Sequence, residues 1–159
     1  EIYVTSSCLR IPLITSCYQK LLSTLPVCIL LKGKINHSFY SDEEWAELDE
    51  DEKKYTSWLV QKPYCFSLIK GSKVPSSMKI VMLLSSSATV KLLNDSEALL
   101  SYDNINGLFI NIKYQDGHAD IITGTSLNIF SLDKTLDSSF DSYIRNFLIY
   151  NGLDFEETI

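Results

Sequence analysis

Apolar and polar residues alternate most regularly between positions 108 and 122. From Leu108 to Tyr114 every second side chain is apolar, and Asp116-Gly117 follows, a pair that favours a type I′ turn. Pairing residue 115 with residue 118 places Lys113 opposite Asp120, which is a favourable cross-strand charge pair. The sequence therefore predicts an antiparallel hairpin with one face in the core.

A helical period replaces this alternation near the C-terminus. Between 136 and 148 the apolar residues recur at spacings of three and four, which predicts an amphipathic helix over about 138–150. Asp137 is its expected N-cap and Asn151-Gly152 its expected end. Because such an apolar stripe must be buried, we expect this helix to cover the hairpin.

Shorter patterns predict the remaining elements. Ser41 and Glu44 have the spacing of a capping box, and Tyr40 and Trp45 that of a hydrophobic staple, so a helix is expected over 42–48. The segment 63–70 fits a helix or an alternating strand, and the helix is favoured. The other expected elements are a helix over 86–93 and strands at 27–31, 78–84 and 126–132.

These elements predict a single α+β domain, in which an antiparallel sheet has the C-terminal helix packed on one face. A doubly wound parallel sheet is disfavoured because strands and helices do not alternate regularly. The order of helix, hairpin and sheet also allows a sliding-clamp-like arrangement, by analogy of fold alone.

Composition narrows the class of protein. A chain of 159 residues with a net charge of −6 is expected to be one acidic domain, and nucleic acid is an unfavourable partner for it. No apolar run approaches the roughly 20 residues that span a bilayer, so no membrane contact is expected. The four cysteines show no paired spacing, which favours a cytoplasmic location over a disulfide framework.

Charge and cysteine content change abruptly near position 35. Residues 1–35 have a net charge of +3 and contain three of the four cysteines, whereas the remainder has a net charge of −9. We therefore divide the chain into a poorly specified segment, 1–33, and a single α+β domain, 34–159.

The residues that could carry chemistry are few. Small hydroxyl residues and backbone N–H groups at Thr123, Gly124, Thr125 and Ser126 could hold an anion, although Gly124 is better explained by a bulge or close strand packing. Lys70 and Lys73 flank a similar segment. His118 lies between Asp116 and Asp120, as a braced general base would, but a polar residue at a hairpin tip is the simpler interpretation.

One further group of residues could form a binding surface. Trp58, with Trp45 and Tyr55 beside the acidic stretch 42–52, could form a surface for a basic partner, or these aromatics could belong to the core. No motif for a metal, a nucleotide or another cofactor is present, and neither a metal nor a cofactor is expected.

Two stretches resemble a family of small clostridial proteins of the Lachnospiraceae type, a domain of unknown function. The resemblance covers about 34–156 and implies no activity, cofactor or catalytic residue. It rests on Trp58, Lys62-Pro63-Tyr64-Cys65-Phe66-Ser67-Leu68-Ile69-Lys70-Gly71 and Pro75, and on Thr123-Gly124-Thr125-Ser126-Leu127 followed by Phe130-Ser131-Leu132-Asp133-Lys134.

The N-terminal third departs from that family. One coding string for 13–24, read one base earlier, gives Phe-Asp-His-Phe-Leu-Leu-Ser-Glu-Ala-Thr-Ile-Asn, which fits the family pattern. A shift of reading frame that ends near Gly33-Lys34 would explain both this departure and the break in charge. We accordingly expect an N-terminus that is exposed or poorly packed.

Three functions remain open. The favoured one is a small non-enzymatic binding or interaction protein with an unknown protein partner, because no nucleophile, base and orienting group can be assembled from the sequence. The alternatives are an anion- or nucleotide-binding protein or enzyme that uses Lys70, Thr123–Ser126 and His118, and a clamp-like domain associated with DNA.

Overall fold

One antiparallel sheet organises the protein in a computed structural model that describes residues 2–12, 27–29, 36–48, 51–70, 77–115 and 118–158. Its strand order is β3-β2-β4-β5-β6-β1-β7, and every neighbouring pair is antiparallel. The strands are β1 (Ile2–Pro12), β2 (Val27–Ile29), β3 (Thr56–Ser57), β4 (Ser77–Leu84), β5 (Ile105–Gln115), β6 (His118–Leu127) and β7 (Glu156–Thr158).

Strands β5 and β6 form the expected hairpin. Gln115 pairs with His118 and Lys113 with Asp120, so the register predicted from the sequence is confirmed. Ile110 and Ile112 are buried on the predicted core face of this hairpin. A slip of one residue would move these side chains to the other face of the sheet, and this cost fixes the register. The turn residues Asp116-Gly117 lie outside the described residues.

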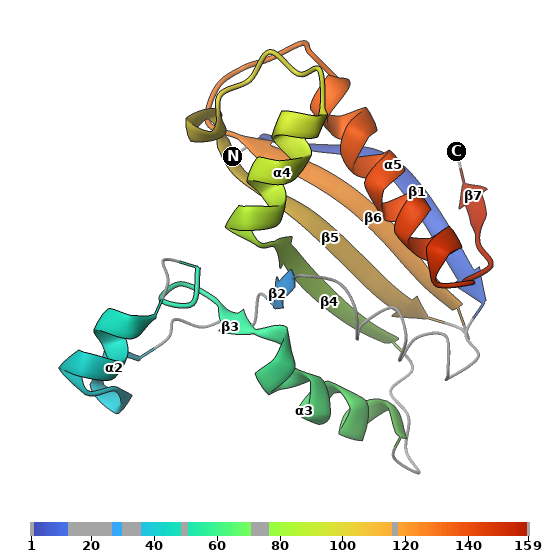
Figure 1. Ribbon diagram of the computed structural model, residues 1–159. Coiled ribbons are helices and arrows are strands. Elements are labelled where there is room, and N and C mark those ends of the chain that lie inside the picture. Colours follow the sequence, from blue (N-terminus) through green and yellow to red (C-terminus); the bar gives the residue numbers. More distant parts are fainter. Residues whose placement is uncertain are drawn as a thin grey trace.

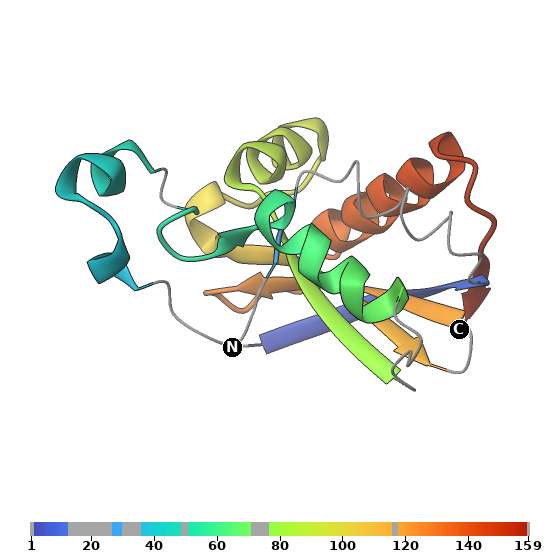
Figure 2. The same ribbon diagram turned by 90° about the horizontal axis from the view of Figure 1, so that it is seen from below.

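Helices α4 (Ser86–Asp95) and α5 (Thr135–Tyr150) lie on the same face of the sheet (Figures 1 and 2). The stripe on α5 is buried as its spacing predicted, and burying each large apolar side chain contributes about 1.5–3 kcal/mol. The expected α+β class, with the C-terminal helix packed on one face of an antiparallel sheet, is confirmed. The buried stripe consists of Leu136, Phe140, Ile144 and Leu148.

Helix α5 begins earlier than the sequence predicted. Its N-cap is Lys134, and Asp137, the expected cap, lies in the first turn. The carboxylate of Asp133 accepts the backbone N–H of Thr135 at 2.9 Å, so a residue just before the helix satisfies one of its first donors. The C-terminal end agrees with the prediction, since Gly152 has a φ of +62°, in the left-handed region.

The strand expected over 126–132 is wrong. Residues 126 and 127 are not the start of a new strand, because β6 continues without a break to Leu127. Beyond it, the backbone N–H of Asn128 donates to the carbonyl of Asn104 at 3.0 Å, and 128–134 form an irregular loop that leads into α5. Partner strand β5 begins at Ile105, paired with Leu127, so the β5–β6 ladder ends there.

The shorter helices follow their local signals. In α2 (Asp42–Glu47) the backbone N–H of Glu44 donates to the Ser41 hydroxyl at 3.2 Å, and the Ser41 N–H donates to the Glu44 carboxylate at 2.8 Å, which confirms the capping box. The rings of Tyr40 and Trp45 lie 5.6 Å apart, as a staple requires. The other helices are α3 (Trp58–Lys70), longer than the expected 63–70, and the 3₁₀ turns η1 (His37–Phe39) and η2 (Tyr102–Asn104).

Two parts of the N-terminal third belong to the sheet. Strand β1 pairs with β6 on one side and β7 on the other, and Leu9 is 1% exposed in the core. The exposed N-terminus that we expected is therefore not observed at Leu9. Residues 13–26 and 30–35 lie outside the described residues. In the part of the chain that the structure describes, no helix is long and apolar enough to cross a membrane.

Candidate functional site

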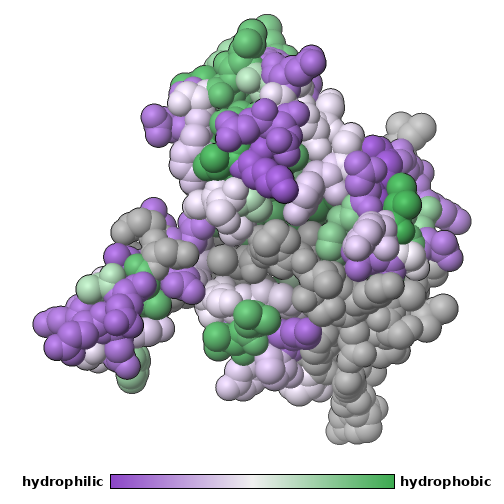
Figure 3. All heavy atoms as spheres, viewed as in Figure 1, coloured by the Kyte–Doolittle hydropathy of each residue, from purple (hydrophilic) through white to green (hydrophobic). Residues whose placement is uncertain are grey.

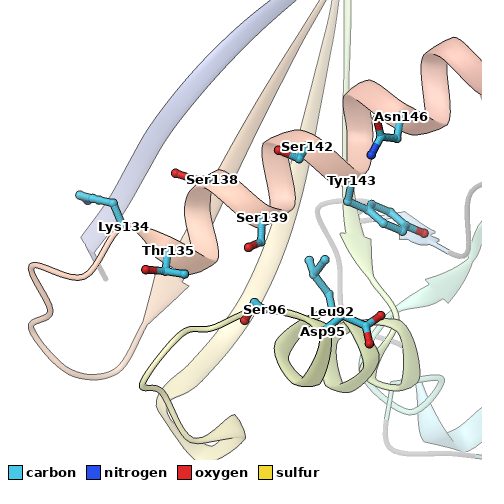
Figure 4. Close-up of a pocket in the computed structure, with 10 residues that line it drawn as sticks. All are labelled: Leu92, Asp95, Ser96, Lys134, Thr135, Ser138, Ser139, Ser142, Tyr143 and Asn146. Atoms are coloured by element: carbon cyan, nitrogen blue, oxygen red, sulfur yellow. The ribbon is translucent and has the colours of Figure 1, made fainter.

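A groove of about 660 Å³ lies between α4 and α5. Figure 4 shows Leu92 of α4 pointing toward α5 and Ser139 of α5 pointing back toward α4. The walls of the groove are rich in hydroxyl groups and contain one cation, Lys134, and one carboxylate, Asp95. The hydroxyl-bearing residues are Ser96, Thr135, Ser138, Ser139, Ser142 and Tyr143.

These hydroxyls can hydrogen-bond a polar ligand, but the lining of this groove contains neither histidine nor cysteine. Partial burial raises the pKa of the Tyr143 phenol above its ordinary value of 10.0, so this group is a neutral donor at physiological pH. Among the described residues, no group of three His, Cys, Asp or Glu side chains is placed to hold a metal ion. The groove can therefore offer hydrogen bonds to a polar ligand, and Asp95 is the carboxylate in its lining.

Beside this groove, two threonines of β6 face the first turns of α5. Thr123 is fully buried, and its hydroxyl donates to the Asp141 carboxylate at 2.5 Å. Thr125 lies two residues along the strand and faces the same side of the sheet, while Asp137 lies one helical turn before Asp141. Thr125 and Asp137 are 3% and 6% exposed, yet the Thr125 hydroxyl has no hydrogen-bond partner within the described residues.

Thr125 lines a small cavity of about 160 Å³, and among the described residues its hydroxyl lacks a hydrogen bond like the one that Thr123 makes with Asp141. Asp137 also lines this cavity, and the ammonium group of Lys134 lies 3.3 Å from the Asp137 carboxylate. The rest of the lining comes from the loop that joins β6 to α5. It consists of Leu127, Ile129, Phe130, Ser131, Leu132 and Asp133.

Asp133 fixes the two loops at this end of the molecule. One carboxylate oxygen accepts hydrogen bonds from the backbone N–H and the hydroxyl of Thr135, and the other accepts the backbone N–H of Leu99 at 3.3 Å. These bonds, the one from the Thr135 hydroxyl first, lower the pKa of Asp133 below its ordinary value of 3.8. The loop before η2 and the loop before α5 are thereby joined through one ionised side chain.

The joined loops display apolar side chains to solvent. Leu99 is 95% exposed, Phe130 76% and Leu132 81%, with Ile129 less exposed. We refer to these four residues as the loop end. Figure 3 shows hydrophobic atoms gathered at the top of the molecule, where Figure 1 draws these two loops.

The surroundings of the loop end are acidic. Asp95, Glu97 and Asp103 are exposed on the segments that lead into and out of the first loop, and Asp133 is ionised between the two loops. Lys134 is the cation beside them, and its charge is paired with Asp137.

Several candidates from the sequence lie elsewhere. Trp58 is 3% exposed and belongs to the core, so the aromatic surface that combined it with Trp45 and Tyr55 is not formed. Lys70 is the last residue of α3, distant in the fold from α5 (Figure 1). Lys73 lies outside the described residues.

The segment Thr123–Ser126 is divided between the two faces of the sheet. Thr123 and Thr125 face the helices, whereas Gly124 and Ser126 alternate with them and face the other side together with His118. His118 lies about 23 Å along the strand from Thr125, and its Nε2 is 4.0 Å from Asp120. The structure does not bring His118 and Thr125 into one site.

Sequence reasoning singled out Thr125 but missed the loop end. Its signal was present as three large apolar residues, Ile129, Phe130 and Leu132, directly after β6. They suggested another strand, and Leu99 stands in a segment for which the sequence predicts no helix or strand. Only the hydrogen bonds of Asp133 show that these residues share one surface.

The structure defines a small α+β domain with a groove and a small cavity beside α5. The chain belongs to a family of unknown function, DUF5721, whose model matches residues 22–156. This agrees with the resemblance to a domain of unknown function, and it begins earlier than the expected start near residue 34. No curated protein and no solved structure matches the chain.

Proposed function

We propose that this protein is a non-enzymatic binding protein that recognises a partner polypeptide through the loop end. The supporting observation is that Leu99, Phe130 and Leu132 are among its most exposed large apolar residues, and that they sit on loops joined by hydrogen bonds. Scattered exposed apolar residues need no explanation, but a cluster at one end of a protein is typical of an interaction surface.

The fixed geometry of these loops favours binding. Asp133 joins the two loops at one point, and Asn128 joins the loop before α5 to η2 at another. The backbone N–H of Asn128 donates to the Asn104 carbonyl at 3.0 Å, and its side chain donates to the Asp103 carbonyl at 2.5 Å. A surface that is ordered before binding loses less conformational entropy when a partner arrives. The apolar anchors can therefore contribute their burial to affinity.

Charge complementarity selects the chemistry of the partner. The acidic residues around the loop end and the net charge of −6 favour a segment with apolar side chains flanked by Lys or Arg. The partner is thus basic, as the acidic stretch 42–52 suggests, but the contact surface is the loop end and not α2 (Figure 1).

An enzymatic or nucleotide-binding function has less support. Such a function would need Lys70, Thr125 and His118 in one site. These residues lie apart, since Lys70 ends α3, whereas Thr125 and His118 lie toward opposite ends of β6. A clamp-like domain on DNA would need a basic surface. The sheet face that carries Lys79 brings it opposite Lys113, but Lys113 also lies opposite Asp120 on the next strand.

The test uses two defined peptides and NMR spectroscopy of the ¹⁵N-labelled full chain. We expect Ac-Lys-Leu-Phe-Lys-Leu-Lys-NH2 to shift the amide signals of Leu99, Phe130 and Leu132. The matched acidic peptide, Ac-Glu-Leu-Phe-Glu-Leu-Glu-NH2, keeps the apolar residues and reverses the charge, and it is expected not to bind.

The matched protein variant replaces Leu99, Phe130 and Leu132 by serine, and it should abolish binding without loss of the folded spectrum. Substituting Leu59, Val60 and Tyr64 by serine, which are exposed on α3, is the control and should leave binding intact. Shifts confined to other surfaces would refute the proposal. So would concentration-dependent dimerisation that the loop-end variant removes, because the occupant would then be a second copy of the chain.

We also propose a cytoplasmic location in a clostridial bacterium of the Firmicutes, and a frame-shifted N-terminal third. The break in charge and cysteine content near residue 35 supports the shift, while the burial of Leu9 in the core weighs against it. The nucleotide sequence provides the test. If no single-base change upstream of the codon for Lys34 restores the family pattern, the frame-shift proposal fails.

A further inference from the structure

The cavity beneath the loop end has the size of one aromatic ring. Its volume is about 160 Å³, and apolar cavities of about 150 Å³ hold a single benzene molecule. This is below the roughly 300 Å³ at which sites for drug-sized ligands begin. A single side chain of a bound polypeptide is therefore an occupant of suitable size.

The lining divides into an apolar wall and a polar floor. Leu127, Ile129 and Phe130 belong to the wall, and Phe130 is also part of the loop end. Thr125 and Asp137 supply a hydroxyl and a carboxylate, each on a residue that is more than nine-tenths buried. An occupant with an apolar body and one hydrogen-bonding tip would match both parts.

The neighbouring pair shows what this floor lacks. Thr123 donates directly to Asp141, whereas the buried hydroxyl of Thr125 has no partner within the described residues. A buried hydroxyl without a partner costs about 1–3 kcal/mol, and a ligand group that reaches it recovers part of that cost. Such a ligand group would act at Thr125 as Asp141 acts at Thr123.

The charges around the floor select a neutral ligand group. Lys134 balances the charge of Asp137, and Asp133 already accepts hydrogen bonds from Thr135 and Leu99. A Lys or Arg head would thus find no unbalanced carboxylate, and a Phe ring would leave the Thr125 hydroxyl unpaired. A phenol can accept from Thr125 and donate to Asp137, because its oxygen does both.

We propose that this cavity receives a tyrosine side chain of the partner polypeptide, with its phenol hydroxyl between Thr125 and Asp137. This inference rests on the proposed function, since it names the anchor residue of the same partner. The surrounding loop end would then contact the residues on either side of that tyrosine.

The first experiment tests the cavity without a peptide. Binding of 4-methylphenol, which is the tyrosine side chain, and of toluene, which lacks only the hydroxyl, is measured by NMR titration of the full chain. We expect 4-methylphenol to bind about five-fold more tightly, the effect of one net hydrogen bond of about 1 kcal/mol. The preference should vanish in Thr125→Val and return in Thr125→Ser, which keeps the hydroxyl.

The second experiment compares Ac-Lys-Tyr-Lys-NH2 with Ac-Lys-Phe-Lys-NH2 on the same three proteins. The tyrosine peptide should bind about five-fold more tightly to the wild type and to Thr125→Ser, and equally with the phenylalanine peptide to Thr125→Val. Equal binding of both peptides to the wild type would overturn the tyrosine inference and leave the loop end standing. A 4-methylphenol preference that survives in Thr125→Val would overturn it as well.

Failure of the proposed function has a different signature. In that case the hydroxyl preference of the small phenol would depend on Thr125, but neither peptide would bind. That result would show a cavity for a free phenol and overturn the assignment of a polypeptide tyrosine.

Discussion

The carboxylate of Asp133 accepts a hydrogen bond from the backbone N–H of Leu99, at 3.3 Å, across 34 positions of sequence. The same carboxylate accepts the backbone N–H of Thr135 at the start of α5. One side chain thus begins the C-terminal helix and holds the most exposed apolar residue of the loop end. The position of the loop end is coupled to the ionisation of this group.

The coupling predicts a local pH dependence. Hydrogen bonds to the carboxylate lower the pKa of Asp133 in the folded protein, so its contribution to order is complete above the ordinary value of 3.8. That contribution is lost as the pH falls through the lowered pKa of the folded state. We expect the Leu99 amide signal in ¹⁵N spectra to titrate with a midpoint below 3.8, and peptide affinity to fall with it.

Asp133→Asn provides the matched variant for that titration. The amide retains one accepting oxygen and cannot serve Leu99 and Thr135 at both positions, so hydrogen exchange at the Leu99 amide should be faster at pH 7. The acid titration of the Leu99 signal should disappear. An unchanged titration in the variant would assign it to another carboxylate.

The two inward-facing threonines of β6 predict opposite effects on stability. Thr123→Val removes the bond to Asp141 and leaves that carboxylate without the Thr123 hydroxyl, so it should lower the free energy of unfolding by about 1–3 kcal/mol. Thr125→Val removes a buried hydroxyl without a described partner and should leave the free energy unchanged or raise it by up to about 1 kcal/mol. Urea unfolding measures both. Equal losses would mean that Thr125 has a partner in solution.

Close packing of β4 on β5 predicts a coupled pair at Gly107 and Leu83. A Cβ atom at position 107 would lie 2.5 Å from Cδ1 of Leu83, which is 5% exposed. We expect Gly107→Ala to destabilise the protein by about 1–3 kcal/mol through overpacking. In a Leu83→Ala background the penalty should shrink, because the clashing methyl group is gone. Additive losses in urea unfolding would show that the backbone of β5 is strained instead.

An ion pair joins β7 to α5. Arg145 Nε lies 2.6 Å from Glu157 Oε1, and this hydrogen bond lowers the pKa of Glu157 below its ordinary value of 4.5. The stabilising effect is present above 4.5 and is lost as the pH falls through the lowered pKa. The protection factor of the Glu157 amide, which is its hydrogen-exchange rate relative to that of an unfolded chain at the same pH, should fall in acid and in Glu157→Gln. Asp154→Asn, at an exposed residue before β7, should leave that protection factor unchanged.

The elements with a strict period were predictable from the sequence. The β5–β6 register was fixed by matching apolar and charged positions on two faces, and the stripe on α5 by spacings of three and four, because each pattern fits only one geometry. The capping box at Ser41 was equally readable, since it depends on residues three positions apart. The end of β6 at Leu127 could not be predicted, because the apolar residues of the following loop have the pattern of a strand. The strand ends there because its partner β5 begins at Ile105, which the sequence does not reveal.

Of the candidate site, the sequence identified Thr125 but not its surroundings. Nothing in the sequence indicates that Thr125 on β6 and Asp137 on α5 line the same cavity. The spacing of Thr123 and Thr125 also does not indicate which of the two hydroxyls lacks a hydrogen-bond partner within the described residues. The loop end could not be predicted either. Leu99 and Phe130 lie on segments far apart in the sequence, and only Asp133 and the end of β6 bring these segments together.

Local periodicity in the sequence by itself determined the α+β class, the hairpin register and the buried face of the C-terminal helix, because each follows from side chains two to four positions apart. Only the tertiary structure decided that β1 lies between β6 and β7, that Trp58 is in the core, and that two loops form one apolar surface over a small cavity. The physical reason is that these features depend on contacts between distant segments, and such contacts are set by the packing of the whole sheet and its helices.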